Sequence, residues 1–343
     1  MSGFEPIDVE DAPTCGAPKF HFGQFTLDEL LRAKASLGVR ISVAIPTLNE
    51  GSTIGTIVQD IRRNLMDAAP LVDELAVIDS GSTDGTQEAA RTAGAQVFGP
   101  SDGSGILGDI RGKGENLWRS LYFLSGDIIV WIDGDIKNFN AGFISGLLGP
   151  LLTVDGVAYT TGYYDRPLQL PGSPMLPNEG GRVTELLVRP FLSCLLPELS
   201  GIHQPIGGEH AGYRRVLETL PFFTSYEVDL GILIDIVRTH GLTAVAQVNL
   251  EQRIHKNRPL ADLHLEAMGI LRALLRRAEQ WGRLRVLDGD LRTTASCFGR
   301  HDSGHPGALG SVERPPIITL PAYRRQQEDR LAQRQEGGYS HAL

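Results

Sequence analysis

The sequence predicts an α/β fold with a mainly parallel sheet flanked by helices, and three observations lead to this prediction. Over residues 41–162, short apolar segments rich in β-branched residues alternate with segments whose apolar residues recur at helical spacing. Such alternation is typical of strand–helix–strand units, which build parallel sheets. Residues 128–132 are apolar at every position, as expected for a strand buried on both faces. Proline or aspartate ends three of the short segments, at the sheet edge where open α/β folds bind ligands.

The composition allows one large domain, or a domain with an appended subdomain, and restricts the partners. The chain has 343 residues with 41% hydrophobic content, which is enough for a full core. A net charge of −9 makes nucleic acid and anionic membranes poor partners. Three cysteines lie far apart without a CxxC pair, which argues against a disulfide framework or a zinc cluster and favours a reducing cytoplasm. No signal-peptide pattern is present, and charged residues and prolines interrupt the longest apolar stretch, residues 186–199, so no membrane span is expected.

Residues 1–39 are predicted to form an N-terminal arm and one helix. Residues 1–24 are rich in glycine and proline and are expected to be irregular. Thr26 can cap the helix, acidic residues occupy its first turn, and Gly38 would end it.

Residues 40–163 are predicted to form a Rossmann-like region. The expected strands are 41–45, 75–78, 96–98, 128–132 and 157–162, and the expected helices are 53–66, 84–93, 115–124 and 143–152. The glycine-rich loop 99–114 contains a GxGxxG pattern. We discount this pattern, because a dinucleotide fingerprint requires a helix that opens inside it, whereas the predicted helix begins later.

A second region is expected over residues 164–286, with a Pro- and Gly-rich loop at 169–181 near its start marking the boundary. It comprises a helix at 184–196, a glycine-rich turn at 204–212, an apolar helix at 228–239, a strand at 243–250 and a long amphipathic helix at 260–281. Residues 287–343 are polar and rich in glycine and proline, and we expect a loosely ordered tail.

Asp133-Gly134-Asp135 directly follows the predicted strand 128–132. Paired carboxylates at the carboxyl end of a strand suit a hard divalent cation, which commonly bridges to the phosphates of a substrate. Asp-Gly is also a common turn dipeptide, so a simple turn explains the same residues. The residues alone leave both interpretations open.

Other polar segments fall at predicted strand ends, namely residues 46–50 (PTLNE), residues 79–84 (DSGSTD) and His255. Further along, residues 180–184 (GGRVT) begin a predicted helix with backbone N–H groups, an arginine and a hydroxyl. This combination suits a phosphate or a carboxylate. An ordinary glycine-led helix start with a surface arginine explains it equally well.

The motifs together resemble those of a known family. "AIPTLNEGSTIG", "VIDSGSTDGT" and "WIDGDIKN" resemble the strand ends and the DxD motif of nucleotide-sugar glycosyltransferases of the GT-A type. "GKGENLWRSL", "GGRVTELLVRP", "QPIGGEHAG" and "AQVNLEQRIHKNRPL" resemble the actinobacterial family of glucosyl-3-phosphoglycerate and mannosyl-3-phosphoglycerate synthases, over roughly residues 40–265. The resemblance implies a GT-A type Rossmann-like sheet, with an acceptor-binding helical subdomain in residues 164–286.

The resemblance implies a donor site at the strand ends. The backbone of residues 46–48 and the carboxylate of Glu50 would hold the base and ribose, and Lys113 would meet the diphosphate. Taken alone, Glu50 is better explained as an acid at a helix N-terminus and Lys113 as a solvated loop lysine. Glu209 and Asp229 would bind sugar hydroxyls, although relatives often carry glutamate in place of Asp229. The implied donor-binding residues are Pro46, Thr47, Leu48, Glu50, Ser80, Lys113, Asp133, Gly134, Asp135, Glu209, Asp229, Arg253 and Arg258.

The resemblance also implies a metal and an acceptor site. Asp135 and His255 would ligate Mg²⁺, Mn²⁺ or Co²⁺, and Asp133 would reach it directly, through water or through the ribose. An isolated histidine is more often structural, so the assignment of His255 depends on its strand-end position and the resemblance. The implied acceptor-binding residues are Gly181, Arg182, Val183, Thr184 and Asn257.

The activity implied is transfer of a hexose from a nucleotide sugar to the 2-hydroxyl of D-3-phosphoglycerate, with retention. Retention by two displacements requires a carboxylate nucleophile, and none is identifiable, so we expect same-face attack with Asp135, Lys113 and Asp229 as the catalytic residues. Overall similarity favours the mannosyl branch, with GDP-mannose as donor and mannosyl-3-phosphoglycerate, a precursor of the compatible solute mannosylglycerate, as product. UDP-glucose or GDP-glucose is the alternative donor.

Two other classes of protein share some of these features. A sugar-phosphate nucleotidyltransferase would need a glycine-rich loop with an arginine after the first strand, which PTLNEGSTIG does not provide. A non-catalytic nucleotide-sugar sensor would not need both the metal carboxylates and the acceptor arginine. The family also implies a homodimer, and the predicted helix 260–281 offers an apolar face that could equally pack on the core of its own chain.

Overall fold

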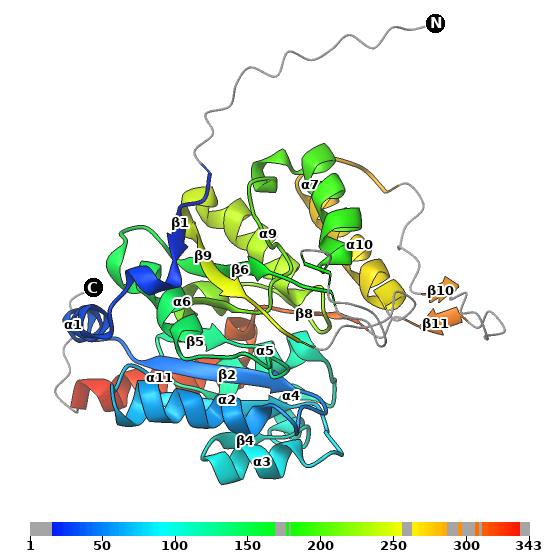
Figure 1. Ribbon diagram of the computed structural model, residues 1–343. Coiled ribbons are helices and arrows are strands. Elements are labelled where there is room, and N and C mark those ends of the chain that lie inside the picture. Colours follow the sequence, from blue (N-terminus) through cyan, green and yellow to red (C-terminus); the bar gives the residue numbers. More distant parts are fainter. Residues whose placement is uncertain are drawn as a thin grey trace, which may run out of the picture.

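The computed structural model describes residues 16–168, 176–177, 180–255, 263–286, 294–296, 306–308 and 311–336. Its centre is an eight-stranded sheet with the order β1-β9-β6-β7-β5-β2-β3-β4 (Figure 1). β7 pairs antiparallel with β5 and β6, and the other neighbouring strands of this sheet are parallel. The mainly parallel α/β sheet predicted from the sequence is therefore confirmed. The strands are β1 (Lys19–His21), β2 (Ile41–Thr47), β3 (Glu74–Asp79), β4 (Gln96–Phe98), β5 (Ile128–Trp131), β6 (Tyr159–Asp165), β7 (His210–Tyr213) and β9 (Val245–Gln252).

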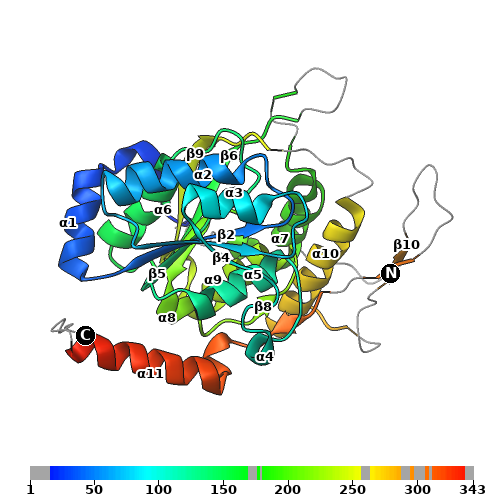
Figure 2. The same ribbon diagram turned by 90° about the horizontal axis from the view of Figure 1, so that it is seen from below.

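Helices cover both faces of the sheet (Figure 2). α2 and α6 pack on one face, and α5 and α9 pack on the other. The described helices are α1 (Leu27–Leu37), α2 (Ile54–Ile61), α3 (Thr86–Ala93), α4 (Ser104–Leu107), α5 (Lys113–Phe123), α6 (Gly142–Thr153), α7 (Arg189–Leu195), α8 (Arg214–Leu217), α9 (Val228–His240), α10 (Leu263–Gln280) and α11 (Pro321–Glu336). Among these helices, none combines the length and apolarity needed to cross a membrane.

The strand β5 explains why the core has two halves. Ile129 and Trp131 belong to the cluster formed with α5 and α9, whereas Ile128 and Val130 belong to the cluster formed with α2 and α6. All four side chains are fully buried. Successive side chains of a strand point to opposite faces, so an uninterrupted apolar segment is what a strand between two helical layers requires.

Several predicted boundaries differ in the structure. The predicted helix 53–66 divides into α2 and a π-helical segment, Arg62–Asp67, and the predicted helix 184–196 divides into a π-helical segment, Thr184–Val188, and α7. The single turn of α4 lies in the glycine-rich loop 99–114, where no helix is predicted. The cap predicted for α1 is present, because Oγ1 of Thr26 accepts from the backbone of Glu29 at 3.3 Å.

The N-terminal arm is more ordered than predicted. Lys19–His21 forms β1, which pairs in parallel with β9 at the edge of the sheet. A Cβ on Gly146 or Gly149 of α6 would lie 2.5 Å or closer to Phe22 or Phe25. These two glycines therefore let the aromatic rings of the arm pack directly on α6.

The segment 204–212, predicted as a turn, also contains part of a strand. Its last residues begin β7, which fills the space between β5 and β6. A Cβ on Gly212 would lie 3.1 Å from the Tyr159 ring, so this glycine permits close packing inside the sheet. Gly212, which the composition places in a turn, therefore serves close packing within the sheet.

The predicted loose tail is wrong for residues 311–336. β12 (Glu313–Arg314) pairs antiparallel with β8 (Phe222–Phe223), and α11 follows it across the lower side of Figure 2. Ile317 and Tyr323 are fully buried. β10 (Thr294–Ser296) and β11 (Pro306–Ala308), which precede this segment in the chain, pair antiparallel.

Candidate active site

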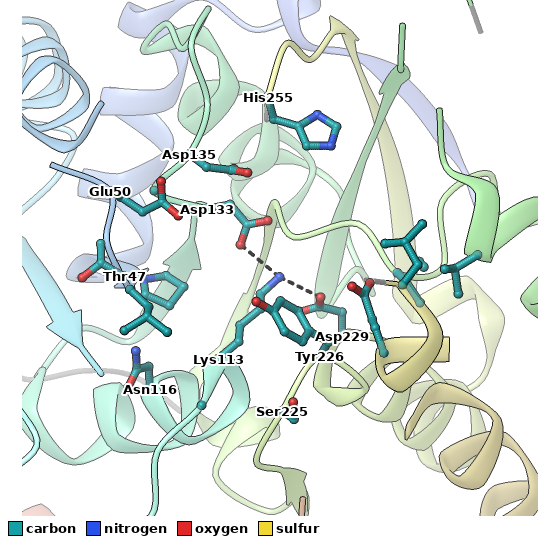
Figure 3. Close-up of a pocket in the computed structure, with 18 of the residues that line it drawn as sticks. Thr47, Glu50, Lys113, Asn116, Asp133, Asp135, Ser225, Tyr226, Asp229 and His255 are labelled. Atoms are coloured by element: carbon teal, nitrogen blue, oxygen red, sulfur yellow. Dashed lines mark hydrogen bonds and ion pairs between the residues drawn. The ribbon is translucent and has the colours of Figure 1, made fainter. Parts of the chain in front are cut away.

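The carboxyl ends of β2, β3 and β5 open into a cavity of about 350 Å³ (Figure 3). Its lining includes residues predicted for the donor, for the metal and for the acceptor. Its size lies in the range of small-molecule sites. The lining residues are Pro46, Thr47, Leu48, Glu50, Ser80, Gly112, Lys113, Asn116, Asp133, Gly134, Asp135, Arg166, Gly181, Arg182, Val183, Ile206, Ser225, Tyr226, Asp229, Arg253, His255, Leu263 and Glu266.

The loop after β3 is organised by Asp79. Its carboxylate accepts hydrogen bonds from Thr47 at 2.9 Å, from Gln87 at 2.8 Å and from the backbone and hydroxyl of Ser82. Burial alone would raise the pKa of Asp79, but the hydrogen bonds, led by those from Ser82, lower it below its ordinary value. The carboxylate therefore joins the ends of β2 and β3, where Thr47 and Ser80 line the cavity.

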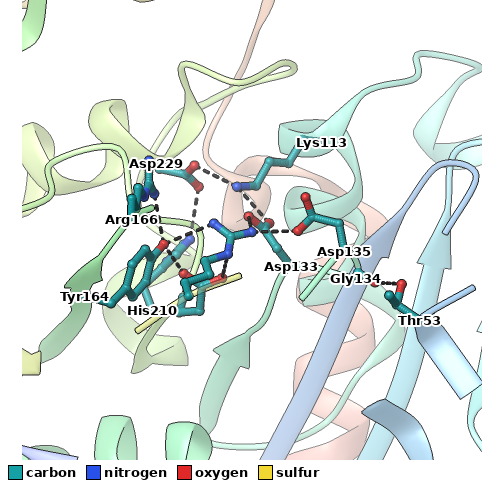
Figure 4. Close-up of polar contacts among 11 residues, drawn as sticks. Thr53, Lys113, Asp133, Gly134, Asp135, Tyr164, Arg166, His210 and Asp229 are labelled. Carbon is teal, nitrogen blue, oxygen red and sulfur yellow. Dashed lines mark hydrogen bonds and ion pairs between the residues drawn. The ribbon is translucent and has the colours of Figure 1, made fainter. Parts of the chain in front are cut away.

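Gly134 allows the two carboxylates after β5 to stand close to the loop after β2. A Cβ on Gly134 would lie 3.0 Å from Cγ2 of Thr47, so a larger residue would require the Thr47 side chain to shift. The hydroxyl of Thr53 donates to the carbonyl oxygen of Gly134 at 2.6 Å (Figure 4). Asp133 and Asp135 are thus attached to the start of α2.

Arg253, from the segment after β9, holds both carboxylates. Its Nη2 donates to Oδ2 of Asp133 at 2.9 Å and to Oδ1 of Asp135 at 2.7 Å. Nη1 donates to the hydroxyl of Tyr164 at 3.1 Å, and Nε lies 3.4 Å from Oε1 of Glu209. Burial would lower the pKa of Arg253, but the surrounding anionic and phenolic groups, with Glu209 foremost, raise it well above its ordinary value. A fixed positive charge therefore lies behind the carboxylate pair.

Lys113, the first residue of α5, links two walls of the cavity. Its Nζ lies 2.9 Å from Oδ1 of Asp133 and 2.8 Å from Oδ2 of Asp229. Burial would lower the pKa of Lys113, but Asp133 and Asp229 raise it well above its ordinary value. A Cβ on Gly112, whose φ is +141°, would lie 2.3 Å from the carbonyl oxygen of Thr224. Only glycine therefore lets the chain enter α5 at this point and bring the ammonium into the cavity.

His255 lines the cavity and lies near Asp135 (Figure 3). Burial, followed by the charge of Arg253, lowers the pKa of His255 to about 4, so the imidazole is neutral at physiological pH. Its Nδ1 is buried without a hydrogen-bond partner in the part of the chain that the structure describes. A neutral imidazole beside two carboxylates has the donor chemistry of a site for a divalent cation.

The predicted metal ligands are not arranged as a closed cluster. Among the described residues, no three histidine, cysteine or carboxylate side chains are grouped closely enough to hold an ion. Burial alone would raise the pKa of Asp133, but Lys113 and Arg253 lower it well below its ordinary value and keep the carboxylate anionic. Two carboxylates and an imidazole are groups that suit a divalent cation. In this structure, ion pairs with Lys113 and Arg253 set the positions of the two carboxylates.

The acceptor residues predicted from the sequence divide between two cavities. Gly181, Arg182 and Val183 line the first cavity, whereas Thr184 is buried and lines an adjacent cavity of about 580 Å³. Gly181 and Arg166 line both cavities. Gly181 has a φ of +73°, a conformation that glycine adopts without strain.

Most of the predicted site residues therefore meet in one place, with three further exceptions. Glu209 does not line the cavity. It is fully buried, accepts a hydrogen bond from Tyr164 and lies 3.4 Å from Arg253, so its predicted contact with the sugar stays a prediction. Asn257 and Arg258 lie outside the described residues.

Several lining residues were not predicted from the sequence, among them Asn116, Arg166, Ser225 and Tyr226. Arg166 directly follows β6. The search for polar residues at the ends of strands, which was used for the other motifs, would therefore have found it. Asn116 lies within "GKGENLWRSL" and donates to the carbonyl oxygen of Ile78 at 2.7 Å. Ser225 and Tyr226 lie in the loop between β8 and α9, and no local pattern distinguishes them from other loop residues.

Comparisons with known proteins identify the family. The model of the Glycosyl transferase family 2 matches residues 42–193. The glucosyl-3-phosphoglycerate synthase of Petrotoga mobilis is 46% identical over 89% of this chain and 94% of that protein. The enzyme of the same name from Mycolicibacterium smegmatis is 42% identical over 86% of this chain and 94% of that protein.

Solved structures extend the comparison to the fold. Glucosyl-3-phosphoglycerate synthase from Mycobacterium tuberculosis, crystallised with Mn²⁺, UDP-glucose and phosphoglyceric acid, matches with a TM-score of 0.76 and 39% identity over 90% of this chain and 99% of that one. Mannosyl-3-phosphoglycerate synthase from Rubrobacter xylanophilus matches with a TM-score of 0.78 and 36% identity over 88% of this chain and 94% of that one. The chain therefore belongs to the family of glucosyl-3-phosphoglycerate and mannosyl-3-phosphoglycerate synthases, which are metal-dependent hexosyltransferases of the GT-A fold.

Proposed function

We propose that this chain transfers glucose from UDP-glucose to the 2-hydroxyl of D-3-phosphoglycerate, with retention at the anomeric carbon. The observation that carries the proposal is the single cavity that Asp133, Asp135 and Lys113 share with Arg182. A group-transfer enzyme needs its donor and its acceptor in one enclosed space. A cavity with a carboxylate pair and an ammonium for a diphosphate, and an arginine for a small phosphorylated acid, provides such a space.

The choice of donor reverses the expectation drawn from the sequence. The mannosyl branch with GDP-mannose is not supported by the relatives, and the alternative with UDP-glucose fits them better. The curated relatives with 41–46% identity are glucosyl-3-phosphoglycerate synthases, whereas the mannosyl enzyme of known structure is 36% identical.

We assign Asp135 and His255 as ligands of a divalent cation, with Asp133 beside them. The complexes of the Mycobacterium tuberculosis enzyme contain Mn²⁺ or Mg²⁺, and either ion suits two carboxylates and a neutral imidazole. When bound, the cation supplies electrostatic stabilisation of the negative charge that develops on the leaving diphosphate.

Lys113 supports the same charge from within the protein. Its ammonium lies between Asp133 and Asp229, so its position is set before substrate arrives. A pre-oriented charge of this kind typically contributes about 3–4 kcal/mol to the stability of a transition state. Lys113 therefore acts on the leaving group, and Asp229 acts by holding Lys113 and by offering a carboxylate to the hydroxyls of the hexose.

Same-face attack is the mechanism that these residues favour. A double displacement needs a free carboxylate below the anomeric carbon, but Asp133 is engaged by Arg253 and Lys113, and Asp229 by Lys113 and His210. The acceptor hydroxyl would instead approach from the side of the leaving diphosphate, whose oxygen takes the proton. Arg182, with the backbone of Gly181 and Val183, would hold the phosphate and carboxylate of the acceptor.

One assay tests the proposal against its competitors. The chain is incubated with Mn²⁺, UDP-glucose and 3-phosphoglycerate, and the phosphorus-containing products are identified. Release of UDP together with a phosphorylated glucoside is the expected result. Release of pyrophosphate would instead indicate a nucleotidyltransferase, and the absence of any product would indicate a protein that only binds nucleotide sugars.

A further inference from the structure

A buried histidine stands directly behind the wall of the cavity. His210 is the first residue of β7 and pairs with Trp131 of β5, two residues before Asp133. It is fully buried and does not belong to the lining. Its ring lies against Trp131 and Tyr159, with centroid separations of 4.9 and 5.6 Å.

His210 makes one polar contact that matters for the cavity. Its Nε2 lies 3.1 Å from Oδ1 of Asp229 (Figure 4). A carboxylate oxygen only accepts, so Nε2 carries the hydrogen. Nδ1 is buried with no hydrogen-bond partner in the described residues. The contact with Asp229 therefore places a hydrogen on Nε2.

This hydrogen bond completes a chain of contacts that ends at the donor site. Oδ1 of Asp229 is held by His210, and Oδ2 of the same carboxylate is held by Lys113 at 2.8 Å. Lys113 in turn lies 2.9 Å from Asp133. With both oxygens held, the carboxylate plane of Asp229 has one orientation, and the ammonium of Lys113 has one position between Asp229 and Asp133.

We propose that His210 is a positioning residue for the donor substrate, acting through Asp229. Its N–H fixes the orientation in which Asp229 meets the hexose and holds Lys113 at the diphosphate. This inference rests on the proposed function, because it assigns the cavity beside Asp229 to the donor. It predicts that loss of the N–H weakens the use of UDP-glucose and leaves the acceptor site unchanged, since Arg182 takes no part in this chain of contacts.

The alternative is that His210 only fills space between Trp131 and Tyr159. A purely packing role requires volume, whereas a positioning role requires the N–H donor. His210→Gln keeps a donor that can reach Asp229, and His210→Phe keeps the ring volume without a donor. Phe222→Leu is a matched packing control, because Phe222 is fully buried against the same Trp131 ring and has no polar atom.

The test compares these variants in the full chain by steady-state kinetics and thermal unfolding. Hydrogen bonds to charged groups contribute enough that we expect His210→Phe to lower kcat/KM for UDP-glucose by about tenfold to a hundredfold. The KM for 3-phosphoglycerate should not change. His210→Gln should restore most of the lost activity, and Phe222→Leu should lower Tm without a comparable loss in kcat/KM.

A double-mutant cycle with Asp229→Ala, measured by calorimetric binding of UDP-glucose, shows whether His210 acts through Asp229. In the Asp229→Ala background, His210→Phe should cause no further loss of affinity. The inference is overturned if Gln and Phe behave alike, or if the effect of His210→Phe persists without Asp229. The wild-type protein in the same assays tests the proposed function separately. If it binds UDP-glucose but does not transfer glucose, the proposed function is contradicted, and the double-mutant cycle of binding affinities can still be interpreted.

Discussion

The guanidinium of Arg253 lies 2.7 Å from the carboxylate of Asp135. The same nitrogen also donates to Asp133 at 2.9 Å. The buried guanidinium of Arg253 therefore offsets the electrostatic repulsion between the carboxylates of Asp133 and Asp135. For Asp133, the charges of Lys113 and Arg253 lower the pKa and keep the carboxylate anionic.

Removal of the Asp135 carboxylate should abolish most turnover without unfolding the chain. Asp135→Ala is expected to lower kcat by roughly a hundredfold or more, because loss of one electrostatic contact to the developing charge typically costs about 3–4 kcal/mol. Arg253 would still be paired with Asp133 and Glu209, so far-UV circular dichroism and Tm should remain close to wild type. Asp155→Ala, in an exposed turn, is the control. Near-normal turnover with an unchanged dependence on Mn²⁺ would refute the role of Asp135.

Arg182 should be specific for the acceptor. Arg182→Ala is expected to raise the KM for 3-phosphoglycerate by about tenfold to a hundredfold, because a charged hydrogen bond to a phosphate or carboxylate is lost. The KM for UDP-glucose should stay the same, since Lys113 and Asp135 are untouched. Arg215→Ala, at an exposed arginine stacked on Tyr213, is the control. An equal rise in both KM values would show that Arg182 supports the cavity as a whole and is not a specific acceptor contact.

The rule that ligands bind beyond the carboxyl ends of the strands explains how much of the site could be predicted. Parallel strands bring their carboxyl ends to one edge of a sheet, so the sequence alone places residues 46–50, 79–84 and 133–135 together. The same rule would have found Arg166. The two carboxylates are an obvious motif, but their engagement by Arg253 could not be predicted, because it depends on the path of the chain after β9.

The parts that could not be predicted are those held by distant contacts. His210–Tyr213 resembles a turn by composition, and only the gap between β5 and β6 makes it a strand. The tail is predicted to be loose because residues 287–343 are polar and rich in glycine and proline. Its order comes from isolated anchors, including Arg314, whose Nε and Nη2 donate to the buried carboxylate of Glu115 at 2.8 and 2.7 Å. Such pairs, 199 residues apart in sequence, leave no periodic pattern.

This anchor leads to a prediction about stability. Arg314→Met would leave Glu115 buried without its bidentate partner, and breaking a buried pair in this way typically costs about 3–5 kcal/mol of unfolding free energy. Denaturant unfolding measures the loss, and Arg324→Ala, at an exposed arginine of α11, should change it little. The double variant Arg314→Met with Glu115→Gln should recover part of the loss. An unchanged midpoint for Arg314→Met would mean that the C-terminal segment does not stabilise α5.

The carboxylate of Asp79 should make the free energy of unfolding depend on pH. Its pKa in the folded chain lies below the ordinary value of 3.8, so the folded state binds its proton less readily than the unfolded state does. Its contribution is therefore complete above pH 3.8 and is lost as pH falls through the lower folded value. Asp79→Asn removes this contribution. Chemical unfolding of both proteins between about pH 6 and pH 3 should show their stabilities converging toward the acid end, and a constant difference at every pH would contradict the role given to the carboxylate.

The most direct measurement of the central claim is a comparison of nucleotide sugars with 3-phosphoglycerate as acceptor in the presence of Mn²⁺. UDP-glucose, GDP-glucose and GDP-mannose are each assayed for kcat/KM, and the product is analysed for the configuration at its anomeric carbon. We predict the highest kcat/KM with UDP-glucose and a product that retains the α configuration. A preference for GDP-mannose, or a product of inverted configuration, would contradict the account.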